Sequence, residues 1–111
     1  MPNDPAEAIV VFTTAADIEE ARRLAEMLVE KRLAACVQIL PAIESVYRWQ
    51  GRIERQPEVL LLAKTQRARF EDLEREVRAI HSYETPEVVA VPVSAGSHPY
   101  FQWLADSLKE P

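Results

Sequence analysis

The chain alternates between two hydrophobic periods, one typical of strands and the other typical of helices. Short apolar runs rich in β-branched residues, at residues 8–13 and 87–93, predict strands that are covered on both faces. Longer stretches with alternating polar and apolar positions, at residues 35–49 and 52–65, predict two further strands. The dipeptide Gln50-Gly51 between them predicts a tight turn in which glycine supplies the positive φ, so the two long strands form a hairpin.

Three helices are expected from apolar positions three and four residues apart. The first begins at about Ile18, because Asp17 can cap it, and it ends near Arg32. Thr65 can cap the second helix, and Ser97 the last. The second helix carries an apolar stripe at Phe70, Leu73, Val77 and Ile80.

The element order β-α-β-β-α-β-α predicts an α+β protein with a ferredoxin-like antiparallel sheet, an extra C-terminal helix and a long hairpin. Two helices cover one side of such a sheet, yet the strands at residues 8–13 and 59–65 carry apolar side chains on both faces. A solvent-exposed apolar face is an aggregation hazard, so we expect further copies of the chain to cover it.

Pro41 lacks the backbone N–H that a strand ladder needs, and it is expected at an edge, bend or bulge of the hairpin.

Composition narrows the function classes for this 111-residue chain, which is expected to be one domain over residues 8–111 after a flexible lead at residues 1–7. Two glycines are too few for a glycine-rich phosphate loop or a dinucleotide fingerprint, and one cysteine excludes an internal disulfide and any multi-cysteine zinc site.

A net charge of −5 argues against a nucleic acid as the binding partner. An RNA-recognition motif shares the element order but needs stacking aromatics, which residues 59–65 lack. No apolar run is long enough for a membrane helix and no signal peptide is visible, which predicts a cytoplasmic protein.

Five strings of the sequence resemble the CutA family of divalent-cation tolerance proteins: LAACVQILP (33–41), ESVYRWQGRIE (44–54), LLLAKT (60–65), HSYETPEVVAVPV (81–93) and YFQWL (100–104). The resemblance implies a ferredoxin-like fold, a tight homotrimer, and a link to divalent metals, copper above all. It also implies a likeness to trimeric PII signalling proteins, which have clefts between subunits. Some bacterial members bind copper through a cysteine and a His-His pair; the matching positions here are Thr13, Ile80 and His81.

His81 is therefore the candidate metal ligand, for Cu(II) or another divalent cation. The alternative interpretation is structural: His81 is a cation that the dipole favours at a helix C-terminus. Lys64, Tyr83 and Glu84 are the candidate ligand-binding residues, because they can line a cleft between subunits that takes a small anion. Cys36 is expected to be a small buried residue, with a soft metal ligand or a Cys36–His81 catalytic pair as the alternatives.

Tyr47, Trp49 and Trp103 are expected to anchor an interface, a setting in which aromatic residues are enriched. No set of nucleophile, base and orienting group is visible, so the chain is not expected to be an enzyme. Two functions remain: a non-catalytic trimer tied to divalent-cation tolerance, and a PII-like small-molecule sensor that uses clefts between subunits.

Overall fold

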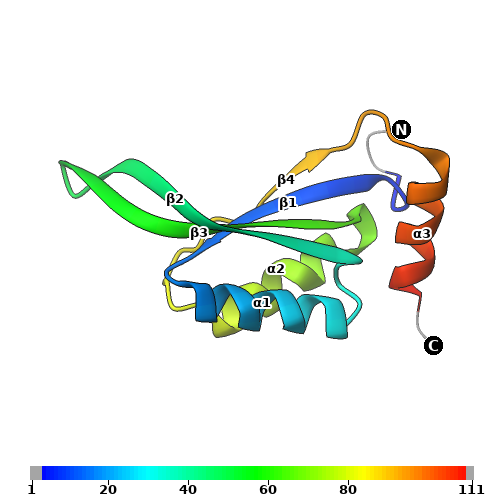
Figure 1. Ribbon diagram of the computed structural model, residues 1–111, viewed down its shortest axis with the longest axis horizontal. Helices are drawn as coiled ribbons and strands as arrows, with labels where there is room; N and C mark the ends of the chain where they lie inside the picture. Colours follow the sequence, from blue (N-terminus) through cyan, green and yellow to red (C-terminus); the bar gives the residue numbers. More distant parts are fainter. Residues whose placement is uncertain (1–3, 110–111) are drawn as a thin grey trace.

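The computed structural model describes residues 4–109 and consists of a four-stranded sheet with two helices on one side and a third helix at its end (Figure 1). The strands are β1 (Ala8–Ala15), β2 (Cys36–Trp49), β3 (Arg52–Gln66) and β4 (Val89–Pro92). The helices are α1 (Ile18–Glu30), α2 (Phe70–Ile80) and α3 (His98–Leu108), with a 3₁₀ turn at Arg67–Arg69. The sheet order is β2-β3-β1-β4 and every pairing is antiparallel, which confirms the predicted ferredoxin-like arrangement.

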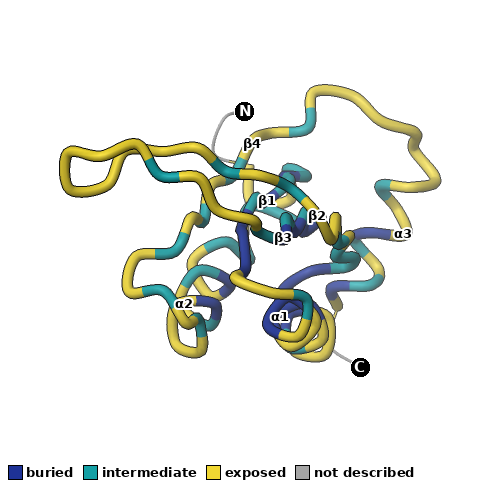
Figure 2. Tube along the Cα trace, turned by 60° about the vertical axis from the view of Figure 1, so that its left-hand side comes forward, coloured by how far each residue is buried: buried dark blue, intermediate teal, exposed yellow. Residues whose placement is uncertain are grey.

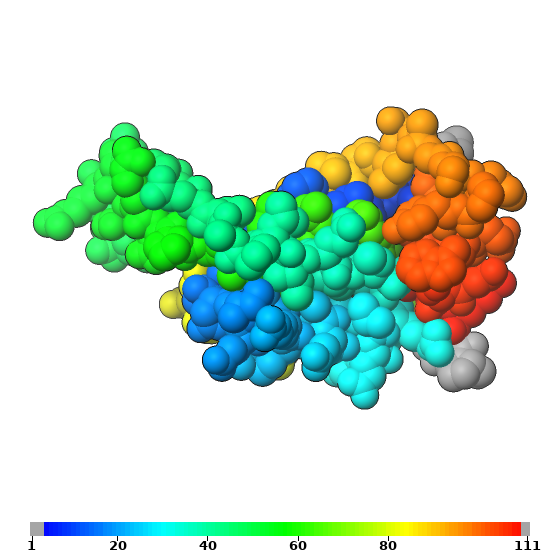
Figure 3. Space-filling view, in the orientation of Figure 1, coloured from blue at the N-terminus to red at the C-terminus, as the bar shows by residue number. Residues whose placement is uncertain are grey.

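The hairpin of β2 and β3 has the predicted turn, with φ of 50° at Gln50 and 79° at Gly51. The ladder register slips between Leu40 and Ile43, so Pro41 lies at an irregularity, as its missing N–H requires. Beyond this irregularity the hairpin leaves the body of the molecule, and Figures 2 and 3 show it projecting with an exposed tip.

The core lies between the sheet and the pair α1 and α2. Alternate positions of the two central strands point into it, and the helices add leucines and alanines, so the buried cluster includes Val11, Leu24, Leu28, Leu61 and Leu73. The opposite face of the sheet has no helix over it in the part of the chain described (Figure 1). The predicted open face is therefore present.

Helix boundaries follow the local capping chemistry with one exception. Asp17 accepts a hydrogen bond from the Glu20 N–H at 2.8 Å, and Ser97 accepts one from the Tyr100 N–H at 3.3 Å, so both predicted caps are confirmed. The predicted Thr65 cap is wrong: β3 continues to Gln66, and the Thr65 hydroxyl is buried and donates to the Leu33 carbonyl at 2.7 Å.

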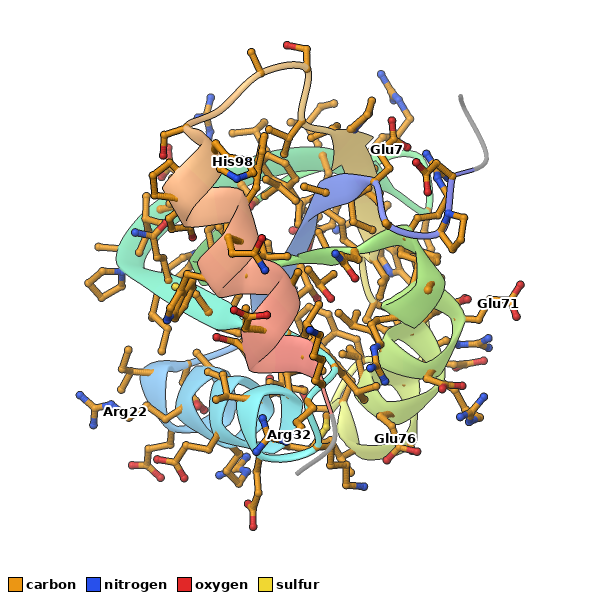
Figure 4. All side chains as sticks on the ribbon, turned by 90° about the vertical axis from the view of Figure 1, so that its right-hand side faces the viewer. Glu7, Arg22, Arg32, Glu71, Glu76 and His98 are labelled. Atoms are coloured by element: carbon orange, nitrogen blue, oxygen red, sulfur yellow. The ribbon has the colours of Figure 1, made fainter. Side chains whose placement is uncertain are left out.

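The last helix is tied to the end of the sheet by two arginines. Arg32 adopts a left-handed φ of 57° just after α1 and donates to the Ser107 carbonyl at 3.0 Å. Arg69 donates to the Leu108 carbonyl at 2.7 Å. In Figure 4, α3 lies in front, with His98 at its upper end and Arg32 near its lower end. α1 is thus two residues shorter than predicted, because the chain turns at Lys31 and Arg32 to meet α3.

The predicted flexible lead falls partly outside the described residues, which begin at Asp4. Glu7 pairs with Arg67 at 2.6 Å, and the backbone carbonyls of Pro5 and Glu7 accept from Ala68 and Arg67. These contacts tie residues 4–7 to the 3₁₀ turn. No helix within residues 4–109 combines the length and the apolar character needed to cross a membrane.

Candidate ligand and metal site

The loop after α2 carries most of the candidate residues, and a buried carboxylate of α1 holds it in place. Glu20 is 4% exposed. Its carboxylate accepts hydrogen bonds from the N–H of Ala16 (3.0 Å), the N–H of Ser82 (2.7 Å) and the hydroxyl of Ser82 (2.9 Å). Burial raises the pKa of Glu20, but the hydrogen bonds from Ala16 and Ser82 outweigh it and hold the pKa below its ordinary value. Glu20 is therefore a charged clamp between α1 and the loop.

His81 lies at the start of this loop with a fully buried side chain and a partner on each ring nitrogen. Its Nδ1 accepts from the Tyr83 N–H at 2.9 Å, so this nitrogen carries no proton. The proton is on Nε2, which donates to the Thr14 carbonyl at 2.7 Å. The Glu20 carboxylate lies 3.7 Å from Nδ1, which in this tautomer is not an ion pair. A metal bond to His81 would have to replace one of these two hydrogen bonds.

Tyr83 connects the loop to the base of the hairpin. Its ring lies 4.8 Å from that of His81 at an interplanar angle of 50°, and its hydroxyl donates to a carboxylate oxygen of Glu58 at 2.7 Å. The pKa of Tyr83 is raised mainly by burial of the phenol, and to a lesser extent by the hydrogen bond to Glu58. The phenol therefore stays protonated and acts as a donor, because the neutral form is the one that the carboxylate favours.

Lys64 does not join Tyr83 and Glu84 within one chain. The register places Lys64 opposite Val10 and Cys36, whereas Tyr83 contacts Glu58, six residues along the same strand. At about 3.3 Å per residue this separation is ~20 Å. The ligand-binding roles of these three residues stay a prediction, since a cleft built from more than one copy is the arrangement that could bring them together.

Lys64 is half-buried on the open face of the sheet, and among residues 4–109 it forms no ion pair. Glu84 is exposed in the loop. Two surface cavities, of about 300 and 480 Å³, are lined by other residues, the first by Glu7, Gln66 and Phe101 and the second by Val29 and Val37 among others.

Metal donors are scattered in one chain. Cys36 stands level with Val10 in the sheet, while His81 contacts Thr14, four residues and roughly 13 Å along β1, so the two are no catalytic pair. Ile80 is 51% exposed and has no donor atom, and the Thr13 hydroxyl is buried without a hydrogen-bond partner in the described chain. Within residues 4–109, no three His, Cys, Asp or Glu side chains gather closely enough to hold a metal ion. The described side chains of one chain therefore do not supply such a donor set for a divalent cation.

Two members of this network could not be assigned a role from the sequence. In the sequence, Glu20 stands out only as the fourth residue of the D-x-x-E capping pattern. Its hydrogen bonds to Ser82 cannot be predicted from neighbouring residues, because Ser82 is 62 positions away. Glu58 carried none, because its partner Tyr83 comes from a loop on the other side of α2.

Comparison with known proteins identifies the family that the five sequence strings resemble. Residues 9–107 match the model of the family described as CutA1 divalent ion tolerance protein. The "Divalent-cation tolerance protein CutA" of Thermus thermophilus is 46% identical over 98 residues, which are 88% of this chain and 95% of that protein. "Protein CutA, chloroplastic" of Arabidopsis thaliana is 43% identical over 102 residues, 92% of this chain, but the chain spans only 56% of that relative. The crystal structure of CutA1 from Oryza sativa superposes with a TM-score of 0.91 at 41% identity, covering 95% of this chain and 96% of that chain.

Proposed function

Because the chain belongs to the CutA1 divalent ion tolerance protein family, we propose that it serves in divalent-cation tolerance as a non-catalytic homotrimer. The observation that carries this proposal is the open face of the sheet, together with the match to the family over residues 9–107. The cytoplasmic location stays a prediction.

The open face is continuous across three strands, because paired residues in a ladder lie on the same face. Phe12 stands beside Leu62 on β3 and Val89 on β4, and Val10 stands beside Val91. Val89 is 53% exposed and Val91 42%. Covering one large aliphatic side chain stabilises by about 1.5–3 kcal/mol, so this face supplies a driving force for association.

The projecting hairpin is a second surface on which a single chain exposes large hydrophobic side chains. Its arm carries exposed large hydrophobic side chains at Val46, Tyr47, Trp49 and Ile53. A contact between two different surfaces, here hairpin and sheet face, is head-to-tail, and such contacts close into a ring when the rotation permits. A closed ring of three copies is one such arrangement, and it agrees with the trimer that the resemblance implies.

The finer part of the proposal concerns the ion. Cu(II) prefers several nitrogen or oxygen donors in one set, and the donors of a single chain lie apart. We therefore place the binding of Cu(II) or another divalent cation between subunits, where the exposed Glu84 carboxylate can be joined by donors of a neighbouring copy.

Titration of the purified protein with Cu(II) and Zn(II) by calorimetry, alongside a nucleotide panel, tests this function. We expect saturable binding of a divalent ion that weakens in Glu84→Gln and not in the matched control Glu19→Gln, whose carboxylate lies on the exposed face of α1. Absence of ion binding would contradict the proposal. Binding of an organic anion that is lost in Lys64→Ala but kept in Lys109→Ala would replace it with the small-molecule sensor.

A further inference from the structure

We infer that His81 is a positioning residue: its imidazole fixes Tyr83, and through the Tyr83 hydroxyl it fixes the base of the projecting hairpin, and it binds no divalent cation. The inference rests on the trimer proposed above, because the hairpin matters most as an arm presented to a second copy. It assigns the one buried histidine of the described chain to assembly rather than to metal.

The first step is that both ring nitrogens of His81 are already used. Nδ1 accepts from the Tyr83 N–H, and Nε2 donates to the Thr14 carbonyl of β1. The side chain is 0% exposed, so a metal ion could reach neither nitrogen without opening the loop. The imidazole thus joins the loop to the central strand of the sheet.

The second step runs from Tyr83 to the hairpin. The Tyr83 ring rests against the imidazole at 4.8 Å, which leaves its hydroxyl 2.7 Å from Glu58. Glu58 pairs with Ile43, the first paired residue beyond the ladder irregularity. Figure 1 shows the far part of the β2–β3 hairpin projecting from the body of the molecule. The bond therefore acts at the point that sets the direction of the arm.

The third step concerns the other end of the loop. Ser82, between His81 and Tyr83, donates twice to the buried Glu20 carboxylate. The loop is consequently held from three sides, by α1, β1 and β3. These three anchors hold Tyr83 in one position. A loop whose histidine bound a metal would need an accessible imidazole and would not need the side chain of Tyr83 to be held in this way.

Two substitutions separate positioning from metal binding. Tyr83→Phe removes only the hydroxyl. His81→Asn keeps an acceptor for the Tyr83 N–H, since an asparagine oxygen can bond the backbone two residues on, but it removes the imidazole and the donor to Thr14. Tyr100→Phe is the control for Tyr83→Phe, because no hydrogen bond from the Tyr100 hydroxyl occurs within residues 4–109.

Sedimentation over a dilution series and Cu(II) calorimetry are the two readouts. We expect Tyr83→Phe to raise the concentration at which the trimer dissociates by about tenfold, the size of a hydrogen bond to a carboxylate, while Tyr100→Phe leaves it unchanged. The calorimetry uses protein concentrations at which both proteins are trimeric, because the proposed cation site lies between subunits. There His81→Asn should leave the Cu(II) affinity within about twofold of the wild type, while the dilution series shows weaker assembly, a split that a ligand role cannot produce.

A drop of about tenfold or more in the Cu(II) affinity of trimeric His81→Asn would overturn the inference, as would an unchanged dissociation midpoint for Tyr83→Phe. If the wild-type protein is itself a monomer, the proposed trimer and the assembly role fail together. The metal part is then decided by ¹⁵N spectra of the His81 ring: an Nε2–H tautomer that Zn(II) leaves unchanged supports positioning, and a Zn(II)-induced change at either nitrogen contradicts it.

Discussion

Glu20, in the first turn of α1, and Ser82, in the loop after α2, share two hydrogen bonds, of 2.7 Å to the Ser82 N–H and 2.9 Å to its hydroxyl. The two residues are 62 positions apart, and the carboxylate is 4% exposed. The contact joins α1 to the loop after α2, which carries His81 and Tyr83. It makes Glu20 a charged group whose loss affects local structure and stability together.

Glu20→Gln is expected to lower the free energy of unfolding by about 2 kcal/mol, since hydrogen bonds to a charged group are worth roughly 1.5–3 kcal/mol each and the amide presents an N–H₂ to donors. Urea denaturation followed by circular dichroism measures the change. Glu19→Gln, one position away on the exposed face of α1, should stay close to the wild type. Equal losses in the two variants would show that the clamp has no special role.

The same carboxylate predicts a pH dependence of stability. Because the pKa of Glu20 is lowered in the folded protein, the unfolded chain binds more protons over this range and stability rises with pH. The contribution of Glu20 is full above its unfolded pKa of about 4.3 and is lost as the pH falls through the folded value. The stability gap between the wild type and Glu20→Gln should therefore narrow on acidification from about pH 6 to about pH 3. A gap that is constant over this range would contradict the assignment.

Two buried threonines should respond in opposite directions to the same change. The Thr13 hydroxyl has no hydrogen-bond partner in the described chain, whereas the Thr65 hydroxyl donates to the Leu33 carbonyl at 2.7 Å. Thr13→Val is expected to stabilise the protein by about 1 kcal/mol, because it removes an unsatisfied buried polar atom. Thr65→Val is expected to destabilise it by about 1 kcal/mol, because it leaves the carbonyl without its donor. Thermal unfolding of the two variants measures these changes in stability. A destabilised Thr13→Val variant would show that the Thr13 hydroxyl forms a hydrogen bond in the protein.

The fold could be predicted from the sequence to within a few residues, because its signals are local. The Asp17 and Ser97 caps act within three residues, and the Gln50-Gly51 turn and the irregularity at Pro41 follow from backbone geometry. The family resemblance placed on the sequence is confirmed by the match over residues 9–107.

The site was less predictable, because its contacts join distant segments. Thr65 has the chemistry of a helix cap, but the strand ladder places it in the core, where its hydroxyl donates a hydrogen bond to the Leu33 carbonyl. His81 has the chemistry of a metal ligand, and only the placement of Thr14 and Tyr83 shows that both its nitrogens are engaged. The separation of Lys64 from Tyr83 follows from strand register, which one sequence does not report.

The most direct test is sedimentation velocity of the wild-type protein over a dilution series. One species of three times the 12.6 kDa chain mass, persisting on dilution, is the predicted result. The reason is the apolar surface of the open sheet face, on which Val89 and Val91 are exposed and Val10, Phe12 and Leu62 are half-buried in the described chain. A stable 12.6 kDa species that stays soluble at every concentration would contradict it.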